Sequence, residues 1–164
     1  MRLKVPIFKN KQIITFMYIS LEDKDLLSYK WHLDKNGYVR TKINNKNKYV
    51  HRIILERIIN KPLSSTILTD HIDCKILNNV RSNLRPCTKR QNNVNKKFYK
   101  KSKTGYRGVT LSINEKRKKR YKAQIKFNNK NIFLGYFFTA IEAAQAYDNA
   151  AKIYNGEFAV LNFN

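Results

Sequence analysis

The stretch TDHIDCKILNNVRSNLRPCTKRQN, Thr69 to Asn92, sets an acid directly before a histidine, continues through an Asn-rich segment and ends on a basic segment with a further Asn. ILTDHI and LRPCT have the composition of two short strands, and KRQNNVNKK has that of the beginning of a helix. The Asn-rich segment between the strands is typical of a loop. The stretch therefore predicts a β-β-α unit.

The residues before this unit predict further short elements. QIITFMYISL and GYVRTKI are rich in β-branched and aromatic residues, which favours strands. Asn36-Gly37 is a strong turn signal. RIILERII, Arg52 to Ile59, predicts a short buried helix that Pro62 stops.

The residues after the unit predict a three-stranded antiparallel sheet. YRGVTLSI, RYKAQIKF and NIFLGYF give the strands, joined by the basic loop NEKRKKR and a tight turn at Asn128-Asn129. Side chains alternate between the faces of a strand, so the second strand has one apolar face and one polar, positive face. The apolar face has Tyr121, Ala123, Ile125 and Phe127, and the positive face has Lys122, Gln124 and Lys126.

A helix is expected after the sheet, from about Ala140 to Tyr154. Thr139 and Glu142 form a capping-box pattern at its start, and Gly156 is a natural stop. Its small residues at helical spacing would let it lie close against the apolar side of the sheet. The predicted fold class is α+β, with the positive sheet face left for a partner.

The net charge of +23 and the pI of about 10.2 favour a polyanionic partner. Residues 96–130 hold 14 Lys and Arg against one acid. The segment Asn95 to Gly105 therefore predicts a solvated linker that can lie along a phosphate backbone. We expect a first domain over 1–95 with its β-β-α core at about 66–96, a basic linker over 96–103, and a second domain over 104–163.

Targeting segments and disulfides are not expected. The N-terminus has no apolar run of signal-peptide type, and no stretch approaches the roughly 20 apolar residues that span a bilayer. Cys74 and Cys87 are too few for a disulfide framework and form no CxxC pair, so no structural zinc is expected. We expect an intracellular protein, in the cytoplasm of a host cell or in the nucleus of a eukaryotic one, with no membrane partner.

TGYRGV, YKAQI and LGYFFTAIEAAQAYDNAAKIYNGEFAVLNF together resemble the plant apetala-type (ethylene-response-factor) DNA-binding domain, across nearly all of residues 104–163. In that family the three-stranded sheet sits in the major groove. Thr110, Ser112 and Tyr121 depart from the plant pattern, so no plant target sequence is transferred. A merely solvated face is the alternative reading. The resemblance implies DNA contacts for Arg107, Lys122, Gln124, Lys126 and Phe133.

The stretch Thr69 to Asn92 contains the pair Asp70-His71, the pair Asn83-Leu84 and Asn92, which lies nine residues after Asn83. This pattern resembles the HNH endonuclease signature, in the variant whose last residue is Asn. The preceding YISLEDKDLLSYKWHLDKNGYVRT and YVHRII resemble the N-terminal portion of phage-type HNH homing endonucleases. Those enzymes often have an apetala-type domain behind the nuclease. The likeness spans almost the whole chain in the same order, and implies a mobile element of phage or virus type.

The residue types suit phosphodiester hydrolysis, which needs an activated water, charge neutralisation and help for a poor leaving group. His71 can take a proton near neutral pH and is the expected general base. Asp70 and the amide of Asn92 are the expected oxygen ligands of a single Mg²⁺ or Mn²⁺, with Asn93 as the alternative to Asn92. Asn83 is expected to brace the loop so that His71 stays aimed.

Adjacent strand residues point to opposite faces, so the resemblance alone implies that Asp70 and His71 act on one phosphate. Asn78 and Asn79 are expected as turn formers, and His32 and His51 as packing or phosphate-contacting groups. Arg81 and Arg85 are expected either to hold phosphates or to solvate the loop. Cys74 stands where relatives usually have Gly, which would distort the turn and slow the enzyme.

The sequence as a whole predicts a metal-dependent homing endonuclease acting on double-stranded DNA. With one active site per chain, a monomer or weak dimer should nick one strand at a time. The first alternative is a DNA-binding regulator with an inactive nuclease site. The second is an RNA-binding protein of ribosomal type.

Overall fold

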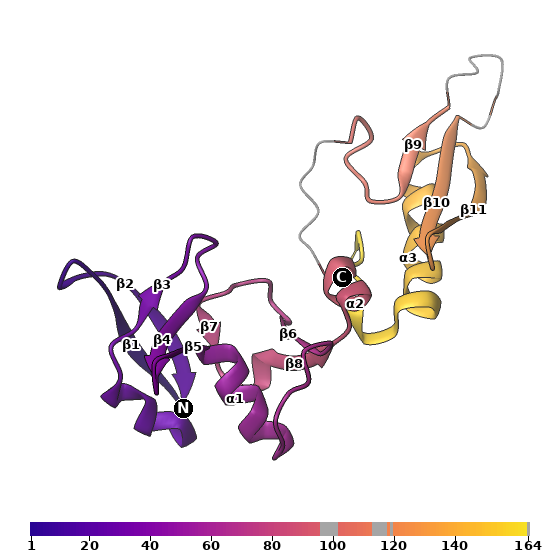
Figure 1. The fold of residues 1–164 in the computed structure, drawn as a ribbon. Helices are drawn as coiled ribbons and strands as arrows, with labels where there is room; N and C mark the ends of the chain where they lie inside the picture. Colours follow the sequence, from indigo (N-terminus) through magenta and orange to yellow (C-terminus); the bar gives the residue numbers. More distant parts are fainter. Residues whose placement is uncertain (96–101, 113–117, 119, 164) are drawn as a thin grey trace. The chain divides into compact units, whose positions relative to one another are not determined.

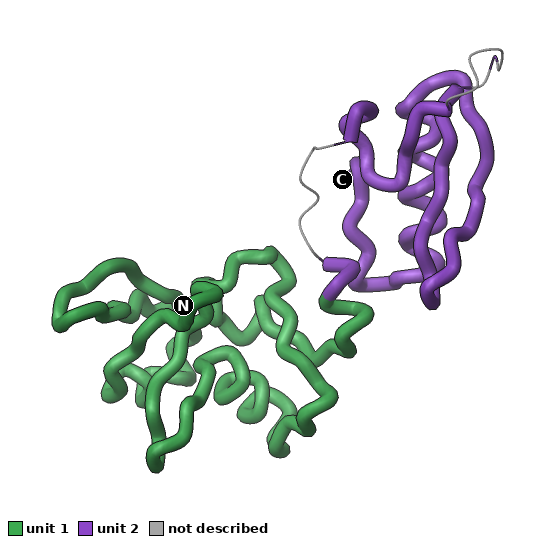
Figure 2. The backbone as a smooth tube through the Cα atoms, turned by 45° about the horizontal axis from the view of Figure 1, so that its top comes forward, with its two compact units in different colours: residues 1–92 green, residues 93–164 purple. Residues whose placement is uncertain are grey.

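The computed structural model describes residues 1–95, 102–112, 118 and 120–163. The chain divides into two compact units, residues 1–92 and 93–164 (Figure 2). Most of the linker predicted over 96–103, and most of the basic loop NEKRKKR, lie outside the described residues. Helices and several small sheets alternate along the chain, which confirms the mixed α+β class (Figure 1).

The first unit contains three small sheets, with strand orders β1-β2-β7, β3-β4-β5 and β6-β8. Its strands are β1 (Arg2–Lys9), β2 (Gln12–Ser20), β3 (His32–Leu33), β4 (Val39–Ile43), β5 (Lys46–Tyr49), β6 (Leu68–His71), β7 (Asn78–Asn79) and β8 (Leu84–Cys87). Its helix is α1 (Val50–Ile59), and its 3-10 turns are η1 (Leu21–Ser28) and η2 (Arg81–Asn83). The helix α2 (Lys89–Val94) begins in the first unit and ends in the second.

The core of the first unit lies between the β1-β2 hairpin and α1. Alternate residues of the two strands are fully buried, as a half-buried hairpin requires. Trp31 is also fully buried, and its indole Nε1 donates to the carbonyl of Leu26 at 2.9 Å. The buried cluster consists of Val5, Ile7, Met17, Ile19, Leu26, Trp31, Val39, Val50, Ile54 and Leu84.

A buried ion-pair network ties η1 to α1 and η2. Asp23 is fully buried, and its carboxylate accepts from Nε and Nη2 of Arg81, both at 2.9 Å, and from Nη1 of Arg57 at 3.0 Å. Removing either arginine would leave the buried Asp23 carboxylate less compensated, so loss of one partner should destabilise the fold. Arg81, expected either to hold phosphates or to solvate the loop, pairs with Asp23 in this structure, although its side chain stays 33% exposed.

The predicted β-β-α unit is present as β6, β8 and α2. β6 pairs antiparallel with β8, with Asp70 opposite Arg85 and His71 opposite Leu84, and α2 follows directly. The helix predicted over 52–59 is α1, but Pro62 does not end it. Asn60 does, in the left-handed conformation at φ 52°, where its N–H donates to the carbonyl of Glu56.

The second unit is a three-stranded antiparallel sheet with one helix. Its elements are β9 (Val109–Leu111), β10 (Tyr121–Phe127), β11 (Lys130–Phe137), α3 (Ala140–Asn155) and the 3-10 turn η3 (Gly156–Phe158), and the strand order is β11-β10-β9. The turn predicted at Asn128-Asn129 has both residues at positive φ, 46° and 61°, as a tight hairpin turn requires. The capping box is also present: the Thr139 hydroxyl accepts from the Glu142 N–H at 3.1 Å, and the Glu142 carboxylate accepts from the Thr139 N–H at 3.3 Å.

α3 lies close to the sheet because its contact face is made of small residues. Ala143, Ala144 and Ala151 are fully buried against a sheet face that includes Ala123 and Ile125. Gly108 is required by the same close approach, because a Cβ there would lie 1.9 Å from Cδ2 of Tyr147 and φ is +73°. Within the described ranges, no helix has the length and apolar character to cross a membrane.

Candidate active site

The β6-β8 ladder brings the predicted site residues into the interior of the first unit. Asp70 is 3% exposed and His71 is 6% exposed. The Asp70 carboxylate accepts a hydrogen bond from Nε of Arg85 at 2.9 Å, and both side chains are largely buried. Arg85, predicted to bind DNA or to solvate the loop, therefore contacts Asp70 in this structure.

The imidazole of His71 is held by Asn79. Its Nε2 lies 3.1 Å from Oδ1 of Asn79, whose Nδ2 donates to the carbonyl of Ile76 and so fixes the orientation of the amide. Nε2 is consequently the donor, and in the neutral ring Nδ1 is the nitrogen without a proton. This is the tautomer that a general base acting through Nδ1 needs.

Asn79 is a site residue that the sequence did not reveal, because it was predicted only as a turn former. It is fully buried in β7, which pairs in parallel with β2, so that Asn79 lies opposite Ile19. A pairing between residues 60 positions apart leaves no local pattern. Only its place in an Asn-rich loop after the histidine was visible in the sequence.

The environment of His71 keeps its imidazole neutral. Burial lowers its pKa below the ordinary value, and the hydrogen bond to Asn79 and the negative charges of Asp73 and Asp70 only partly offset this effect. A neutral imidazole near pH 7 can accept a proton. The negative charge of Asp70 therefore acts on His71. The two side chains have different hydrogen-bond partners, Arg85 for Asp70 and Asn79 for His71.

Asn83 fastens the loop that follows His71. Its Oδ1 accepts from the N–H of Asp73 at 3.0 Å, and its Nδ2 donates to the carboxylate of Asp73 at 2.9 Å and to the carbonyl of Asn78 at 2.7 Å. Its own carbonyl accepts from the N–H of Ile72 at 2.9 Å. One side chain thus connects the start and the end of the loop, which limits how far the end of β6 can move.

Cys87 is influenced by both expected metal ligands, by the charge of Asp70 and by the backbone N–H of Asn92. Burial, and to a lesser degree the charge of Asp70, raise the pKa of the Cys87 thiol to about 11, against the opposing effects of Arg85 and the backbone N–H of Asn92. The thiol is therefore close to the Asp70 carboxylate and to the backbone N–H of Asn92 on α2. Asn92 is half-buried on α2, and the alternative ligand Asn93 is exposed.

The oxygen donors of the β-β-α unit suit a hard divalent cation. In the described parts of the chain, no three His, Cys, Asp or Glu side chains gather as a metal-binding group. Mg²⁺ typically needs only one or two protein ligands, with water and substrate phosphate completing its shell. Asp70 has one carboxylate that could serve as such a ligand, and the Asn92 side chain on α2 would have to supply the second oxygen. The guanidinium of Arg85, which donates to Asp70, would have to accommodate the added charge.

His51 packs against His71 in a small aromatic cluster. The rings of His51 and His71 meet edge to face with centroids 5.6 Å apart, and Tyr49 stacks on His51 at 5.4 Å. Tyr38 lies 5.3 Å from His51 and 6.5 Å from His71. Among the described atoms, Nδ1 of His51 is buried without a hydrogen-bond partner. This packing agrees with one of the two roles expected for His51.

His51 should make the stability of the first unit depend on pH. Burial lowers its pKa to about 3, with the charges of His71 and Arg52 adding to the effect and Asp34 opposing it. The unfolded chain then binds a proton below about pH 6.5 that the folded chain does not, so stability falls as the pH is lowered from 6.5 towards 3, by up to about 1.4 kcal/mol per pH unit. Urea unfolding at pH 7.5, 6 and 5 measures this slope.

The control for this prediction is His51→Phe, which keeps the aromatic packing and removes the titrating group. Its stability should fall less steeply with decreasing pH than that of the original chain, because only His71 still contributes from this cluster. Equal slopes for the two proteins would show that His51 does not titrate as the structure requires.

Cys74 occupies a left-handed position in the loop after His71. Its φ is 57°, and its N–H donates to the carbonyl of His71 at 2.9 Å. A side chain with a Cβ is disfavoured in this conformation, which gives a physical reason for the Gly expected at this position in relatives. The turn nevertheless closes on His71 with Cys74 in place.

Replacing Cys74 by glycine should relieve this backbone strain. We expect Cys74→Gly to raise the free energy of unfolding by about 1 kcal/mol, less the extra entropy of glycine in the unfolded chain. Thermal or urea unfolding measures the change, and Cys74→Ala is the matched control because it removes the thiol and keeps the Cβ. If Cys74→Ala stabilised the chain as much as Cys74→Gly, the gain would come from removing the thiol and not from relieving backbone strain.

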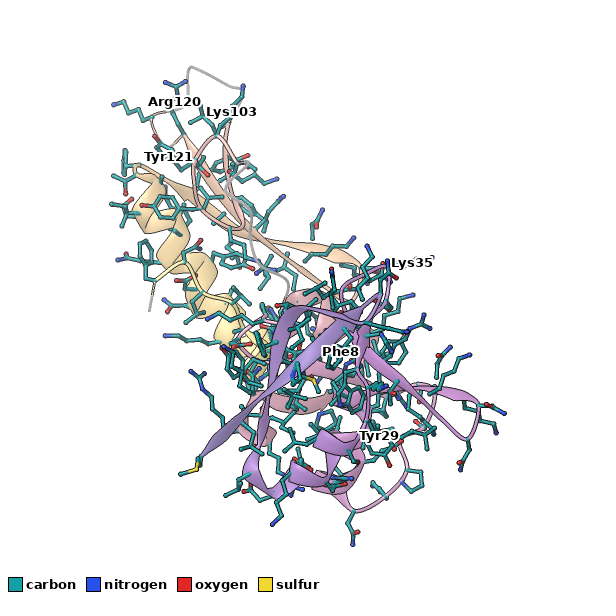
Figure 3. The ribbon with its side chains drawn as sticks, turned by 90° about the vertical axis from the view of Figure 1, so that its left-hand side faces the viewer. Phe8, Tyr29, Lys35, Lys103, Arg120 and Tyr121 are labelled. Carbon is teal, nitrogen blue, oxygen red and sulfur yellow. The ribbon has the colours of Figure 1, made fainter. Side chains whose placement is uncertain are left out.

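The second unit presents the predicted positive sheet face. Ala123 and Ile125 of β10 are buried towards α3, so Lys122, Gln124 and Lys126 lie on the opposite face. On β11, Phe133 is 54% exposed, and Nζ of Lys122 lies 6.0 Å from the centre of its ring. Other cations are exposed on both units, including Lys35, Lys103 and Arg120 (Figure 3).

Arg107 differs from the other predicted DNA-binding residues of the second unit. Its Nη2 donates to the carbonyl of Val94 at 2.8 Å, and its backbone N–H donates to Oδ1 of Asn162 at 2.7 Å. The side chain is half-buried and takes part in the internal contacts of the second unit. The sheet face proper therefore consists of Lys122, Gln124, Lys126 and Phe133.

Comparison with known proteins identifies the family. No family model matches the chain. An uncharacterized HNH endonuclease of Acanthamoeba polyphaga mimivirus is 36% identical over 149 residues, which cover 90% of this chain and 75% of the relative. The aligned length exceeds that of either compact unit, so the likeness extends into both. The chain belongs to the HNH endonuclease family.

Proposed function

We propose that the chain is a metal-dependent DNA endonuclease that nicks double-stranded DNA, of the homing type. The observation that supports this most is the hydrogen bond from Nε2 of His71 to Asn79, inside a β-β-α unit that also contains Asp70. It gives a buried, neutral imidazole of defined tautomer beside a carboxylate.

In the proposed reaction Nδ1 of His71 takes a proton from the attacking water, and the amide oxygen of Asn79 stabilises the protonated ring through Nε2–H. Asn83 holds the following loop, so the ring keeps its direction during proton transfer. Asp70 and Asn92 would hold a single Mg²⁺ or Mn²⁺. When bound, such an ion neutralises charge on the phosphate and stabilises the departing 3′ oxygen.

The second unit would place the nuclease on its substrate. Its resemblance to the apetala-type domain, together with a cationic sheet face opposite α3, supports binding in the major groove of duplex DNA. Lys122, Gln124 and Lys126 would contact bases or phosphates, and Phe133 would supply an apolar contact. One active site per chain favours a nick over a double-strand break.

The proposal is tested with supercoiled plasmid, the purified full chain and Mg²⁺ or Mn²⁺. We expect a nicked-circle product that EDTA abolishes. Binding of the plasmid without nicking, under both metals, would favour the alternative of a DNA-binding regulator. Stronger binding of structured RNA than of duplex DNA at fixed salt would favour the ribosomal-type alternative.

A further inference from the structure

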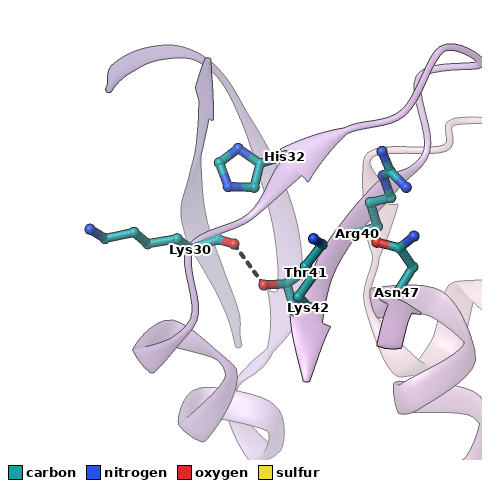
Figure 4. A pocket seen from close by; sticks show the side chains of 6 residues that line it. All are labelled: Lys30, His32, Arg40, Thr41, Lys42 and Asn47. Carbon is teal, nitrogen blue, oxygen red and sulfur yellow. Dashed lines mark hydrogen bonds between the residues drawn. The ribbon is translucent and has the colours of Figure 1, made fainter. Parts of the chain in front are cut away.

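A basic pocket lies on the β3-β4-β5 sheet of the first unit, which is a different sheet from the β6-β8 pair. Its volume is about 330 Å³, and Figure 4 shows the side chains that line it. In the sheet, Arg40 pairs with His32 on one side and with Tyr49 on the other, and Lys42 pairs with Asn47. The lining residues are Lys30, His32, Arg40, Thr41, Lys42 and Asn47.

Cross-strand partners place their side chains on the same face, and so do residues two apart on one strand. His32, Arg40, Lys42 and Asn47 therefore share one face of the sheet. Two hydrogen bonds hold the pocket in shape: the Thr41 hydroxyl donates to the carbonyl of Lys30 at 2.8 Å, and Nδ1 of His32 donates to the carbonyl of Phe8 at 2.9 Å.

Among the described residues, the cations of this pocket form no ion pair with a carboxylate. Arg57, Arg81 and Arg85 all form ion pairs with carboxylates, but within the described residues no ion pair involves Lys30, Arg40 or Lys42. The charge of Arg40 reaches Asp34, whose carboxylate is otherwise engaged by the N–H groups of Asn36 and Tyr38 and by the Tyr49 hydroxyl. Residues 30–49 contain six Lys and Arg and one acid.

The same sheet connects the pocket to the candidate active site. Tyr49 is the cross-strand neighbour of Arg40, stacks on His51 at 5.4 Å, and His51 meets His71 at 5.6 Å. An extended polyanion that presents one phosphate to His71 could therefore continue over this face. A pocket for a small anion would be expected to enclose it, whereas these cations are spread along an open sheet face.

We propose that the pocket binds the phosphate backbone of duplex DNA that flanks the scissile phosphate. This inference rests on the proposed function for the path of the bound DNA from the active site. What it adds is a binding site for the DNA backbone. Lys30, Arg40 and Lys42 supply the charge, and His32 and Asn47 supply hydrogen-bonding groups. Such contacts position the duplex and carry no sequence information.

The test compares two charge-matched double variants of the full chain. Arg40→Gln with Lys42→Gln removes two cations of the pocket, and Lys24→Gln with Lys61→Gln removes two exposed cations elsewhere in the first unit. Binding of a fluorescent 40-base-pair duplex is measured by anisotropy at several salt concentrations. We expect the pocket variant to bind at least about 10-fold more weakly and to have a salt slope about 1.8 shallower, and the control to change less than threefold.

The result that overturns the inference is an affinity and salt slope of the pocket variant equal to those of the control. Displacement of the duplex by structured RNA at lower concentration would overturn it as well. Lys42→Glu, at an exposed position, gives a second reading if the loss of Arg40 destabilises the chain. Because binding is measured without metal and without cleavage, a failure to nick DNA would count against the proposed function and leave this test unaffected.

Discussion

Replacing His71 by alanine is expected to slow nicking of supercoiled DNA by roughly 10²- to 10⁴-fold, the usual contribution of a general base. The reason is that Nδ1 of His71 is the proposed proton acceptor, in a tautomer fixed by Asn79. DNA affinity should change by less than about twofold, because the charges proposed to bind DNA lie elsewhere. Initial rates and anisotropy on the same protein preparation measure both quantities.

Asn79→Ala provides the comparison for this prediction. It leaves the imidazole in place but removes the acceptor of its Nε2–H, so nicking should fall by less than in His71→Ala. Unchanged nicking in His71→Ala, by a protein free of contaminating nuclease, would remove His71 from the reaction. Equal loss of DNA binding and nicking would assign His71 to binding instead.

The second large effect is expected for Asp70→Asn, which should reduce nicking by at least about 100-fold at millimolar Mg²⁺. The carboxylate is the only charged ligand in the proposed metal site, and an amide binds a hard cation far more weakly. The change also removes the carboxylate from the buried ion pair with Arg85, and breaking such a pair typically costs about 3–5 kcal/mol of stability. Mn²⁺ titration calorimetry in the absence of DNA separates lost metal binding from lost folding.

The double variant Asp70→Asn with Arg85→Gln is the control for stability. It removes both charges of the pair, so folding should recover relative to Asp70→Asn while metal binding stays weak. Full Mn²⁺ affinity in either variant would show that the cation is held by other residues. Recovery of both stability and nicking would mean that Asp70 acts only through the fold.

The sequence predicted the elements whose pattern is local. The α3 helix has its capping box and small contact residues in consecutive turns, and β10 has a strict alternation, so both are where they were expected. α1 was also predicted from its apolar run, but its end was assigned to Pro62, although Asn60 follows the run directly and Asn favours the left-handed conformation. β1, which pairs antiparallel with β2 and forms a bridge from Ile7 to Trp31, was not predicted.

The side-chain partners of the candidate site could not be predicted in the same way. Asp70, His71 and Asn83 were identified from spacing and resemblance, and the structure places all three in one β-β-α unit and its loop. The partners of Arg81 and Arg85 depend on tertiary contacts, and sequence alone offered phosphate or solvent for both. The carboxylates of Asp23 and Asp70 are buried and need a charged partner, so Arg81 pairs with Asp23 and Arg85 pairs with Asp70.

The central claim is that the imidazole of His71 lies beside a cation held by Asp70 and Asn92. The chain has three histidines, so its imidazole proton NMR signals can be followed one by one while substoichiometric Mn²⁺ is added. We predict that the paramagnetic ion broadens the His71 signals first, and that this broadening is lost in Asp70→Asn. His71 signals that stay sharp while Mn²⁺ is bound to the folded chain would contradict the account.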